Sequence, residues 1–214
     1  MLRRPPPSTQ GVSSAASAVY TRPMMLCSVA SLLSQILVSN KPLTIIILAA
    51  GKGTRMDSDL PKVLHPIGEL PMITRVVQTA QELGASRIIP VLGYKHELVQ
   101  SALKDEPVEC VLQLQQLGTA HAVMQCRETL HNFNGNILIL YGDVPLITVE
   151  TLAKLIFLHD EQDSLGTILT ADLSDPKGYG RVIRDKNGNL SKIVEEKDAT
   201  DGERAVQVIN SGIY

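Results

Sequence analysis

Beyond an N-terminal leader, apolar and polar positions follow two different periods along the chain. Leu43–Ala49 is a continuous apolar run with three consecutive isoleucines, which is typical of a strand covered on both faces. Apolar side chains in residues 71–83 recur at helical spacing, with Pro71 suited to the first turn and Gly84 to the end. Arg87–Leu92 then predicts a second strand. This order of strand, helix and strand indicates a βαβ unit.

The same alternation continues to the end of the chain. We expect further helices at residues 96–103, 119–130 and 148–159, the last capped by Thr148, and further strands at residues 108–114, 136–141 and 166–173. Residues 181–185 and 190–196 flank Lys186-Asn187-Gly188, a strong hairpin signal, and residues 205–214 are expected to be extended. The pattern predicts an α/β fold with a mostly parallel central sheet and a small β-hairpin insertion. Ligands of such sheets bind beyond the carboxyl ends of the strands.

The composition narrows the classes of function. The chain has 214 residues, 44% of them hydrophobic, and a net charge of −2, which argues against nucleic-acid binding by bulk electrostatics. Trp is absent and aromatic residues make up 3%, so stacking platforms for single-stranded nucleic acid are not expected. Cys27, Cys110 and Cys126 are odd in number and scattered. They favour a reducing compartment, the cytoplasm, and we expect each to be a small buried apolar residue.

The leader, residues 1–42, differs from the rest of the chain. It contains no acidic residue, is rich in Ser, Ala and Pro, and carries several basic side chains. Its apolar stretch at residues 24–38 is too short and too polar to span a bilayer. A targeting segment is one interpretation of such a composition. We favour a disordered extension, or an upstream start that the cell does not use, and assign the fold to residues 43–214.

The first strand is followed directly by a loop that is poor in side chains and rich in positive charge, LAAGKGTRMDSDLPKVLHP at residues 48–66. Gly51 and Gly53 let backbone N–H groups approach a ligand closely. The two alanines before them leave room for a flat group. Arg55 and Lys62 add charge that matches phosphate. The loop therefore predicts a polyphosphate bound beside a nucleoside.

This loop has three other possible interpretations. The dinucleotide fingerprint G-x-G-x-x-G fails, because its third glycine position is Met56. The P-loop pattern fails as well, because Gly51-Lys52 is followed by Gly53 and the first glycine position is Ile46. An ordinary glycine-rich turn between strand and helix remains open, with Arg55 and Lys62 as solvated surface charges.

Two later segments also follow predicted strands. In QLGTAHAV, residues 116–123, Gly118 and Thr119 open a helix, where backbone N–H groups and a hydroxyl suit an anion or a base edge. Thr119 as a plain helix N-cap is the alternative. In YGDVPL, residues 141–146, Asp143 lies at the carboxyl end of what we expect to be a central strand. A carboxylate there, beside phosphate-binding loops, usually holds Mg²⁺, and a helix or turn cap is the alternative.

Six motifs in this order and spacing resemble those of the sugar-1-phosphate nucleotidyltransferases: LAAGKGTRM with PK, QLGTAHAV, YGDVPL, GYGRV, IVEEKDAT and INSGI. The resemblance is greatest to the N-terminal uridyltransferase domain of the bacterial bifunctional uridyltransferase/acetyltransferases, and it covers residues 43–214. The first motif is shared by many nucleotidyltransferases, whereas QLGTAHAV with YGDVP and IVEEKDAT is more specific. The resemblance implies a Rossmann-like nucleotidyltransferase domain.

The resemblance also implies roles for individual residues. The stretch against the uridine and its phosphates would be Leu48, Ala49, Ala50 and Gly51. Arg55 and Lys62 would contact the phosphates. Gln113 would bind the uracil edge, with Gly118 and Thr119 beside it. The YGD motif, whose Asp binds Mg²⁺ in the family, corresponds to Tyr141, Gly142 and Asp143. The positions that hold the N-acetylglucosamine part correspond to Gly180, Glu195 and Asn210, which would otherwise be interpreted as a turn glycine, a solvated carboxylate and a loop cap.

The implied enzyme transfers UMP from UTP to N-acetylglucosamine 1-phosphate with Mg²⁺ as cofactor, releasing pyrophosphate and UDP-N-acetylglucosamine for cell-wall peptidoglycan and lipopolysaccharide precursors. Two alternatives stay open: a nucleotidyltransferase for another sugar phosphate or base, and a nucleotide-binding fragment without activity. In the family, a second Mg²⁺ ligand (an Asn), a helical arm and a trimer-forming acetyltransferase β-helix would follow Tyr214. No hexapeptide repeat of the β-helix kind occurs in the chain, so no acetyl transfer is expected.

Overall fold

The computed structural model describes residues 41–53, 56 and 58–214. The interpretation of the leader up to residue 40, the expectation for Cys27 and the role proposed for Arg55 lie outside the described residues.

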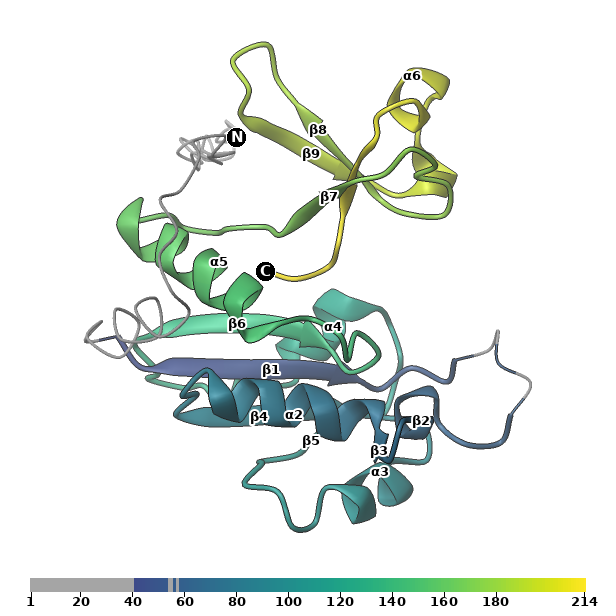
Figure 1. Cartoon of the computed structure of the whole chain (residues 1–214), viewed down its shortest axis with the longest axis vertical. Coiled ribbons are helices and arrows are strands. Elements are labelled where there is room, and N and C mark those ends of the chain that lie inside the picture. Colours follow the sequence, from purple (N-terminus) through teal and green to yellow (C-terminus); the bar gives the residue numbers. More distant parts are fainter. Residues whose placement is uncertain (1–40, 54–55, 57) are drawn as a thin grey trace, which may run out of the picture.

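A parallel sheet forms the lower half of the molecule in Figure 1, in the strand order β5-β4-β1-β6. Its strands are β1 (Leu43–Ala49), β4 (Arg87–Leu92), β5 (Val111–Leu112) and β6 (Asn136–Tyr141). Every side chain of β1 is buried, because β4 and β6 flank it and helices cover both faces. The expectation of an α/β, Rossmann-like fold with a mostly parallel central sheet is confirmed.

The two faces of β1 pack against different helices, as the alternation of side chains in a strand requires. Ile45 and Ile47 belong to one apolar core with α2 (Met72–Glu82), α3 (His96–Ala102) and α5 (Val149–Glu161). Ile46 and Leu48 belong to a second, smaller core that contains Ala122 of α4 (Thr119–Met124). Because both faces of β1 are buried, its sequence is a continuous apolar run and does not alternate between apolar and polar residues.

The upper half of the molecule is a second four-stranded sheet, in the order β7-β10-β8-β9, with antiparallel pairing throughout (Figure 1). Its strands are β7 (Thr170–Asp172), β8 (Arg181–Arg184), β9 (Leu190–Val194) and β10 (Val208–Asn210). The predicted hairpin is confirmed as β8 and β9, with Gly188 at φ +84° in its turn. The expectation of only a small hairpin insertion was incomplete, because β7 and β10 extend the hairpin to a sheet.

The remaining short elements are β2 (Pro66–Ile67), β3 (Leu70–Pro71), the 3-10 turns η1 (Lys62–Leu64) and η2 (Glu196–Asp198), and α6 (Asp201–Arg204). α6 begins with a capping box, in which the Thr200 side chain and Glu203 satisfy each other's backbone N–H groups. The end of the chain connects the two sheets. Tyr214 and Ile139 exchange both backbone hydrogen bonds, at 2.9 and 3.3 Å, so Tyr214 lies alongside β6 as an antiparallel neighbour.

Several predicted bounds were wrong, and most of the errors lie at sheet edges. The strand expected at residues 108–114 is reduced to the two residues of β5, with Leu112 41% and Leu114 80% exposed at the edge of the parallel sheet. β6 was expected to be central and is instead the last strand in the order of that sheet, with Tyr214 paired on its outer side. The strand expected at residues 166–173 is the three-residue β7.

The bounds of the other expected helices were predicted within two residues, and only the helix expected at residues 119–130 was much too long. Thr148 caps α5 as expected, its hydroxyl accepting from the Thr151 N–H at 3.2 Å, although the helix runs on to Glu161. The helix expected at residues 119–130 ends as an α-helix at Met124. Beyond it, the N–H groups of Cys126 and Arg127 bond to carbonyls three residues back, so the backbone tightens into successive turns.

Candidate functional site

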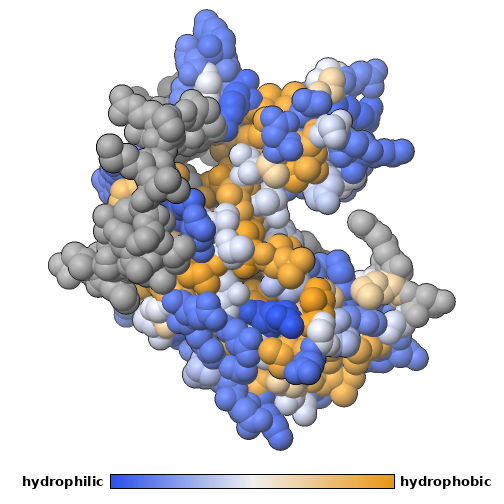
Figure 2. Space-filling view, in the orientation of Figure 1, coloured by the Kyte–Doolittle hydropathy of each residue, from blue (hydrophilic) through white to orange (hydrophobic). Residues whose placement is uncertain are grey.

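A cleft of about 790 Å³ lies between the two sheets, at the carboxyl ends of β1 and β6. The space-filling view shows the molecule hollowed between its upper and lower halves, with apolar residues gathered beside the hollow (Figure 2). Thirteen of the predicted site residues line it: Leu48, Ala49, Ala50, Gly51, Lys62, Gln113, Gly118, Thr119, Tyr141, Asp143, Gly180, Glu195 and Asn210. The cleft is therefore where the sequence placed a ligand, beyond the carboxyl ends of parallel strands.

The loop after β1 forms one wall of the cleft. Gly53 has φ +66°, and a Cβ there would lie 2.7 Å from the Lys62 Cβ, so only glycine fits between the loop and Lys62. The Ala50 carbonyl accepts from the Tyr94 N–H at 3.1 Å, which fastens the loop to the segment after β4. Lys52 lies 5.4 Å from the centroid of the Tyr94 ring, within cation–π range. The loop therefore exposes backbone and positive charge on an anchored turn.

Lys62 and Asp143 meet in the cleft, although they are 81 residues apart in sequence. The Lys62 Nζ lies 2.6 Å from an Asp143 carboxylate oxygen, with the side chains 41% and 27% exposed. Gly142, the residue before Asp143, packs closely against the first strand and α2. Its N–H donates to the Leu48 carbonyl at 2.9 Å, and a Cβ there would lie 2.9 Å from Ile73. Asp143 does not cap the next helix, since Thr148 takes that place.

Gln113 lies buried at the floor of the cleft, 3% exposed. Its amide nitrogen is 3.1 Å from the Gly118 carbonyl and 2.9 Å from His121 Nδ1. Gly118 is the N-cap of α4 and has φ +106°, a backbone conformation that favours glycine. The interpretation of Thr119 as the plain N-cap was therefore wrong. Thr119 is the first residue of the helix, and its side chain hydrogen-bonds to Tyr141.

Tyr141 lines the cleft at the end of β6. Burial raises the pKa of the Tyr141 phenol, the charges of Tyr214, Asp143 and Glu195 raise it further, and the hydrogen bond with Thr119 opposes them. The phenol is therefore a neutral hydrogen-bonding group at physiological pH. Gly212, at φ +81°, packs against its ring so closely that a Cβ there would overlap the ring.

The three residues predicted for the sugar side come together on the antiparallel sheet. The Asn210 N–H donates to the Gly180 carbonyl at 2.8 Å, and a Cβ on Gly180 would lie 3.3 Å from a Glu195 carboxylate oxygen. The Asn210 side chain donates to the Tyr214 hydroxyl at 2.6 Å and accepts from the Gly212 N–H at 3.0 Å. Polar groups from the residue before β8, the residue after β9 and the end of β10 are thus held in one place.

Gly53, predicted with Gly51 to let the loop approach a ligand, lines the cleft as well. Other lining residues were not among the predicted site residues: Lys52, Met56, Val63, Gln116, Gly178, Tyr179, Ser211 and Gly212. Most of them lie inside or beside the motifs quoted above. The motifs therefore indicated the right segments of the chain, but not which residues of each segment line the cleft. Gly142 was predicted and does not line the cleft itself, since it packs behind Asp143 against Ile73 and Val63.

The cleft suits Mg²⁺ better than a cation that needs a cage of protein ligands. Among the described residues no group of three or more His, Cys, Asp or Glu side chains is placed to hold a metal. Asp143 is a half-buried carboxylate in the cleft beside a loop suited to phosphate. Mg²⁺ is typically bound by one or two carboxylates together with substrate phosphates and water, and the residues present fit that pattern. Within the described part of the chain, no helix has the length and apolar character needed to cross a membrane.

Comparison with known proteins identifies the family of the chain. Residues 45–190 match the family model of the MobA-like NTP transferase domain. The chain is 50% identical to the bifunctional protein GlmU of Geotalea uraniireducens over 173 residues, 80% of this chain and 38% of that protein. It is 50% identical to the bifunctional protein GlmU of Streptococcus agalactiae over 169 residues, 79% of this chain and 37% of that protein. The chain thus spans a little over a third of the length of these relatives.

A solved structure shares the fold. A candidate glucose-1-phosphate thymidylyltransferase from Bacillus anthracis superposes with a TM-score of 0.60 at 21% identity, covering 80% of this chain and 70% of that one. At this identity the likeness concerns the fold alone.

Proposed function

The chain belongs to the family of MobA-like NTP transferase domains, and from this premise we propose that it transfers UMP from UTP to N-acetylglucosamine 1-phosphate. The products are UDP-N-acetylglucosamine and pyrophosphate. The observation that carries the proposal is the pairing of Lys62 with Asp143 in a cleft that also contains Gln113 and the Asn210 cluster. About 50% identity to two GlmU proteins supports the choice of base and sugar.

The parallel-sheet wall of the cleft is proposed to bind the nucleotide. Leu48, Ala49 and Ala50 offer a small apolar surface to the nucleoside, and Gly51 offers its backbone to the phosphates. The Lys62 ammonium has three donors, so it can keep its contact with Asp143 and also bind a phosphate oxygen. Arg55 is proposed as a second phosphate contact and stays a prediction from the sequence.

The antiparallel-sheet wall is proposed to bind the sugar. Gly180 leaves space beside the Glu195 carboxylate, which can accept hydrogen bonds from sugar hydroxyls. The Asn210 amide, held by Tyr214 and Gly212, supplies a second fixed polar group. The sugar 1-phosphate would then point from this wall toward Lys62 and Asp143.

The chemistry requires positioning and charge neutralisation rather than a base. The attacking sugar-phosphate oxygen is already anionic, so nothing has to remove a proton from it. Asp143 would hold Mg²⁺, which when bound supplies positive charge against the repulsion between the sugar phosphate and the α-phosphate. Lys62 and Arg55 would stabilise the charge that develops on the leaving pyrophosphate. We place this activity in the cytoplasm, in the supply of peptidoglycan and lipopolysaccharide precursors.

The test is pyrophosphate release by the 214-residue chain with Mg²⁺, UTP and N-acetylglucosamine 1-phosphate, compared with Lys62→Ala. We expect release from the wild type and a loss of about 10²–10³-fold in kcat/KM for the variant, the scale of removing one preorganised charge donor. Lys154→Ala, an exposed lysine on α5 paired with Glu150, is the matched control and should keep full activity. Equal rates for Lys62→Ala and Lys154→Ala would overturn the proposal.

A further inference from the structure

The side-chain amide of Gln113 is held in one orientation by two neighbours. Its nitrogen lies 3.1 Å from the Gly118 carbonyl, which also accepts the Ala122 N–H at 3.1 Å. A carbonyl oxygen only accepts hydrogen bonds, so the amide group that faces it has to be the NH₂ end of Gln113. Both the burial of Gln113 and the α4 N-terminus that carries Gly118 keep this contact in place.

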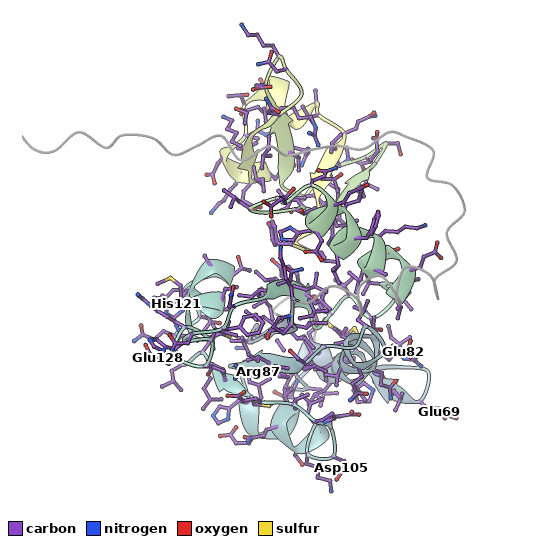
Figure 3. The ribbon with its side chains drawn as sticks, turned by 90° about the vertical axis from the view of Figure 1, so that its left-hand side faces the viewer. Glu69, Glu82, Arg87, Asp105, His121 and Glu128 are labelled. Carbon is purple, nitrogen blue, oxygen red and sulfur yellow. The ribbon has the colours of Figure 1, made fainter. Side chains whose placement is uncertain are left out.

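His121 fixes the same amide from its second side. His121 Nδ1 lies 2.9 Å from the Gln113 nitrogen, so Nδ1 accepts the second amide hydrogen and the ring proton of the neutral imidazole is on Nε2. The Gln125 side-chain nitrogen donates to the His121 carbonyl at 3.0 Å, so its NH₂ end faces His121 Nε2 at 3.2 Å. A neutral imidazole accepts at one nitrogen only, and the shorter contact, to Gln113, assigns that role to Nδ1. His121 comes from α4 in the parallel-sheet half of the molecule (Figure 3) and is not among the residues that line the cleft.

Both hydrogens of the Gln113 amide are thereby engaged, and its oxygen is the group left for a ligand. Among the described residues, no hydrogen bond engages that oxygen, and Gln113 lines the cleft. A fixed acceptor binds a base that presents an N–H at the matching place. Uracil carries a hydrogen on N3, whereas N3 of cytosine is an acceptor and would meet the Gln113 oxygen with repulsion.

We propose that His121 is a positioning residue for base selection, which holds Gln113 with its oxygen toward the cleft and so favours UTP over CTP. The inference rests on the proposed function and adds to it the residue that fixes the orientation of the Gln113 amide. With His121 unable to accept, one amide hydrogen loses its partner. The amide is then free to turn and offer its NH₂ group to the N3 acceptor of cytosine, at the cost of the Gly118 contact.

The experiment measures the dissociation constants of UTP and of CTP by calorimetry for the wild-type chain, His121→Phe and His121→Asn. Phe keeps a ring and removes the acceptor, whereas the Asn side-chain oxygen can take the place of Nδ1. We expect His121→Phe to lower the UTP preference about fivefold, the scale of one hydrogen bond, and His121→Asn to restore most of it. His131→Phe, an exposed histidine in the turns after α4, is the matched control and should leave the ratio unchanged.

The uridyl specificity and the role of His121 are tested by different outcomes. A wild-type chain that binds CTP as well as UTP would overturn the proposed uridyl specificity. A wild-type preference for UTP that stays the same in His121→Phe would overturn the role of His121 while leaving the proposed function in place. If the Phe variant does not fold, His121→Ala removes the same acceptor from a helix position, and its UTP/CTP ratio decides between these outcomes.

Discussion

The two sheets on either side of the cleft are stabilised by different interactions. In the parallel sheet, Ile45, Ile46 and Ile47 are each 0% exposed and are buried between helices on both faces. In the antiparallel sheet the largest fully buried side chain is a cation, Arg181, 1% exposed and 2.7 Å from Glu196. The first sheet depends on apolar burial, and the second depends much more on ion pairs and caps.

The titratable groups divide in the same way. Burial raises the pKa of the Cys126 thiol to about 11, with the charge of Glu109 adding to the effect, in the core behind β1. On the antiparallel side, Lys192 and the Thr200 backbone and hydroxyl lower the pKa of Glu203 to about 2, and Arg181 lowers the pKa of Glu196. The buried thiol behind β1 is therefore neutral, whereas the two glutamates of the antiparallel half act as charged groups.

The two walls of the cleft are also proposed to have different roles, with the nucleotide and Mg²⁺ on the parallel-sheet side. The largest effect is expected from a substitution of Asp143 on that side. Asp143→Asn removes the carboxylate proposed to hold Mg²⁺ but leaves a side chain of the same size in a partly exposed place. We expect kcat/KM to fall by about 10³-fold, near the upper end of single electrostatic groups, with the thermal midpoint nearly unchanged. Pyrophosphate release over a Mg²⁺ titration measures it. Glu150→Gln on the exposed face of α5 is the control. Activity close to wild type at low millimolar Mg²⁺ would rule out the assignment.

Matched core truncations compare the two sheets directly. Ile47→Ala in β1 and Ile209→Ala in β10 remove the same atoms from sites 0% and 4% exposed. We expect Ile47→Ala to cost about 4 kcal/mol of unfolding free energy, because helices and strands surround the site and cannot close the cavity. Ile209→Ala should cost about 2 kcal/mol, because Ile209 lies outside both large apolar cores. Urea denaturation gives both values, and equal losses would remove the contrast between the sheets.

Glu195 tests whether the antiparallel wall serves the sugar alone. Glu195→Gln keeps the shape of the side chain beside Gly180 and removes its charge. We expect KM for N-acetylglucosamine 1-phosphate to rise about tenfold, the scale of one hydrogen bond to a charged group, and the UTP dissociation constant to stay the same. Initial rates and calorimetry separate the two readouts, with the exposed Glu161→Gln on α5 as control. A weakened UTP affinity would show that the division between the walls is wrong.

The elements that could be predicted from the sequence are those whose structure depends on neighbouring residues in the chain. Leu43–Ala49 and Arg87–Leu92 were predicted to the residue, because strands buried on both faces are uninterrupted apolar runs. The full antiparallel sheet was missed because β10 pairs with β7 and β8, which lie far back in the chain. Edge strands such as β5 were overextended, since apolar residues like Leu114 are exposed there.

The candidate site shows the same limit. Its motifs were recognisable as short local patterns, and the cleft brings together nearly all of them. The contacts between motifs could not be predicted, because Gly212 against the Tyr141 ring and Lys62 against Asp143 depend on the tertiary fold. The clamp of His121 on Gln113 was missed although the residues are close in sequence, because it depends on where α4 begins.

The smallest effect expected is a loss of stability in acid at Glu203, on the antiparallel side. A carboxylate whose folded pKa lies below its ordinary value stabilises the fold above the ordinary value and loses that contribution as pH falls through the folded value. For Glu203 the window runs from its ordinary value of 4.5 down to about 2. Glu203 accepts from the Thr200 N–H at 2.9 Å and lies 2.5 Å from Lys192, so protonation weakens both the cap of α6 and the contact to β9.

Glu203→Gln measures this contribution, because it removes the charge and keeps a side chain of the same size. The variant should have a lower thermal midpoint than the wild type at pH 6, and the difference should shrink as pH falls from 4.5 toward 2, because the wild-type carboxylate then loses its charge as well. Glu82→Gln, exposed at the end of α2 in the parallel-sheet half (Figure 3), is the control and should follow the wild type. Added salt should reduce the Glu203→Gln difference at pH 6, since the ion pair with Lys192 is partly exposed and screened. A difference that is independent of pH and salt would mean that Glu203 stabilises the sheet by packing, and that the two halves are less different than their charges indicate.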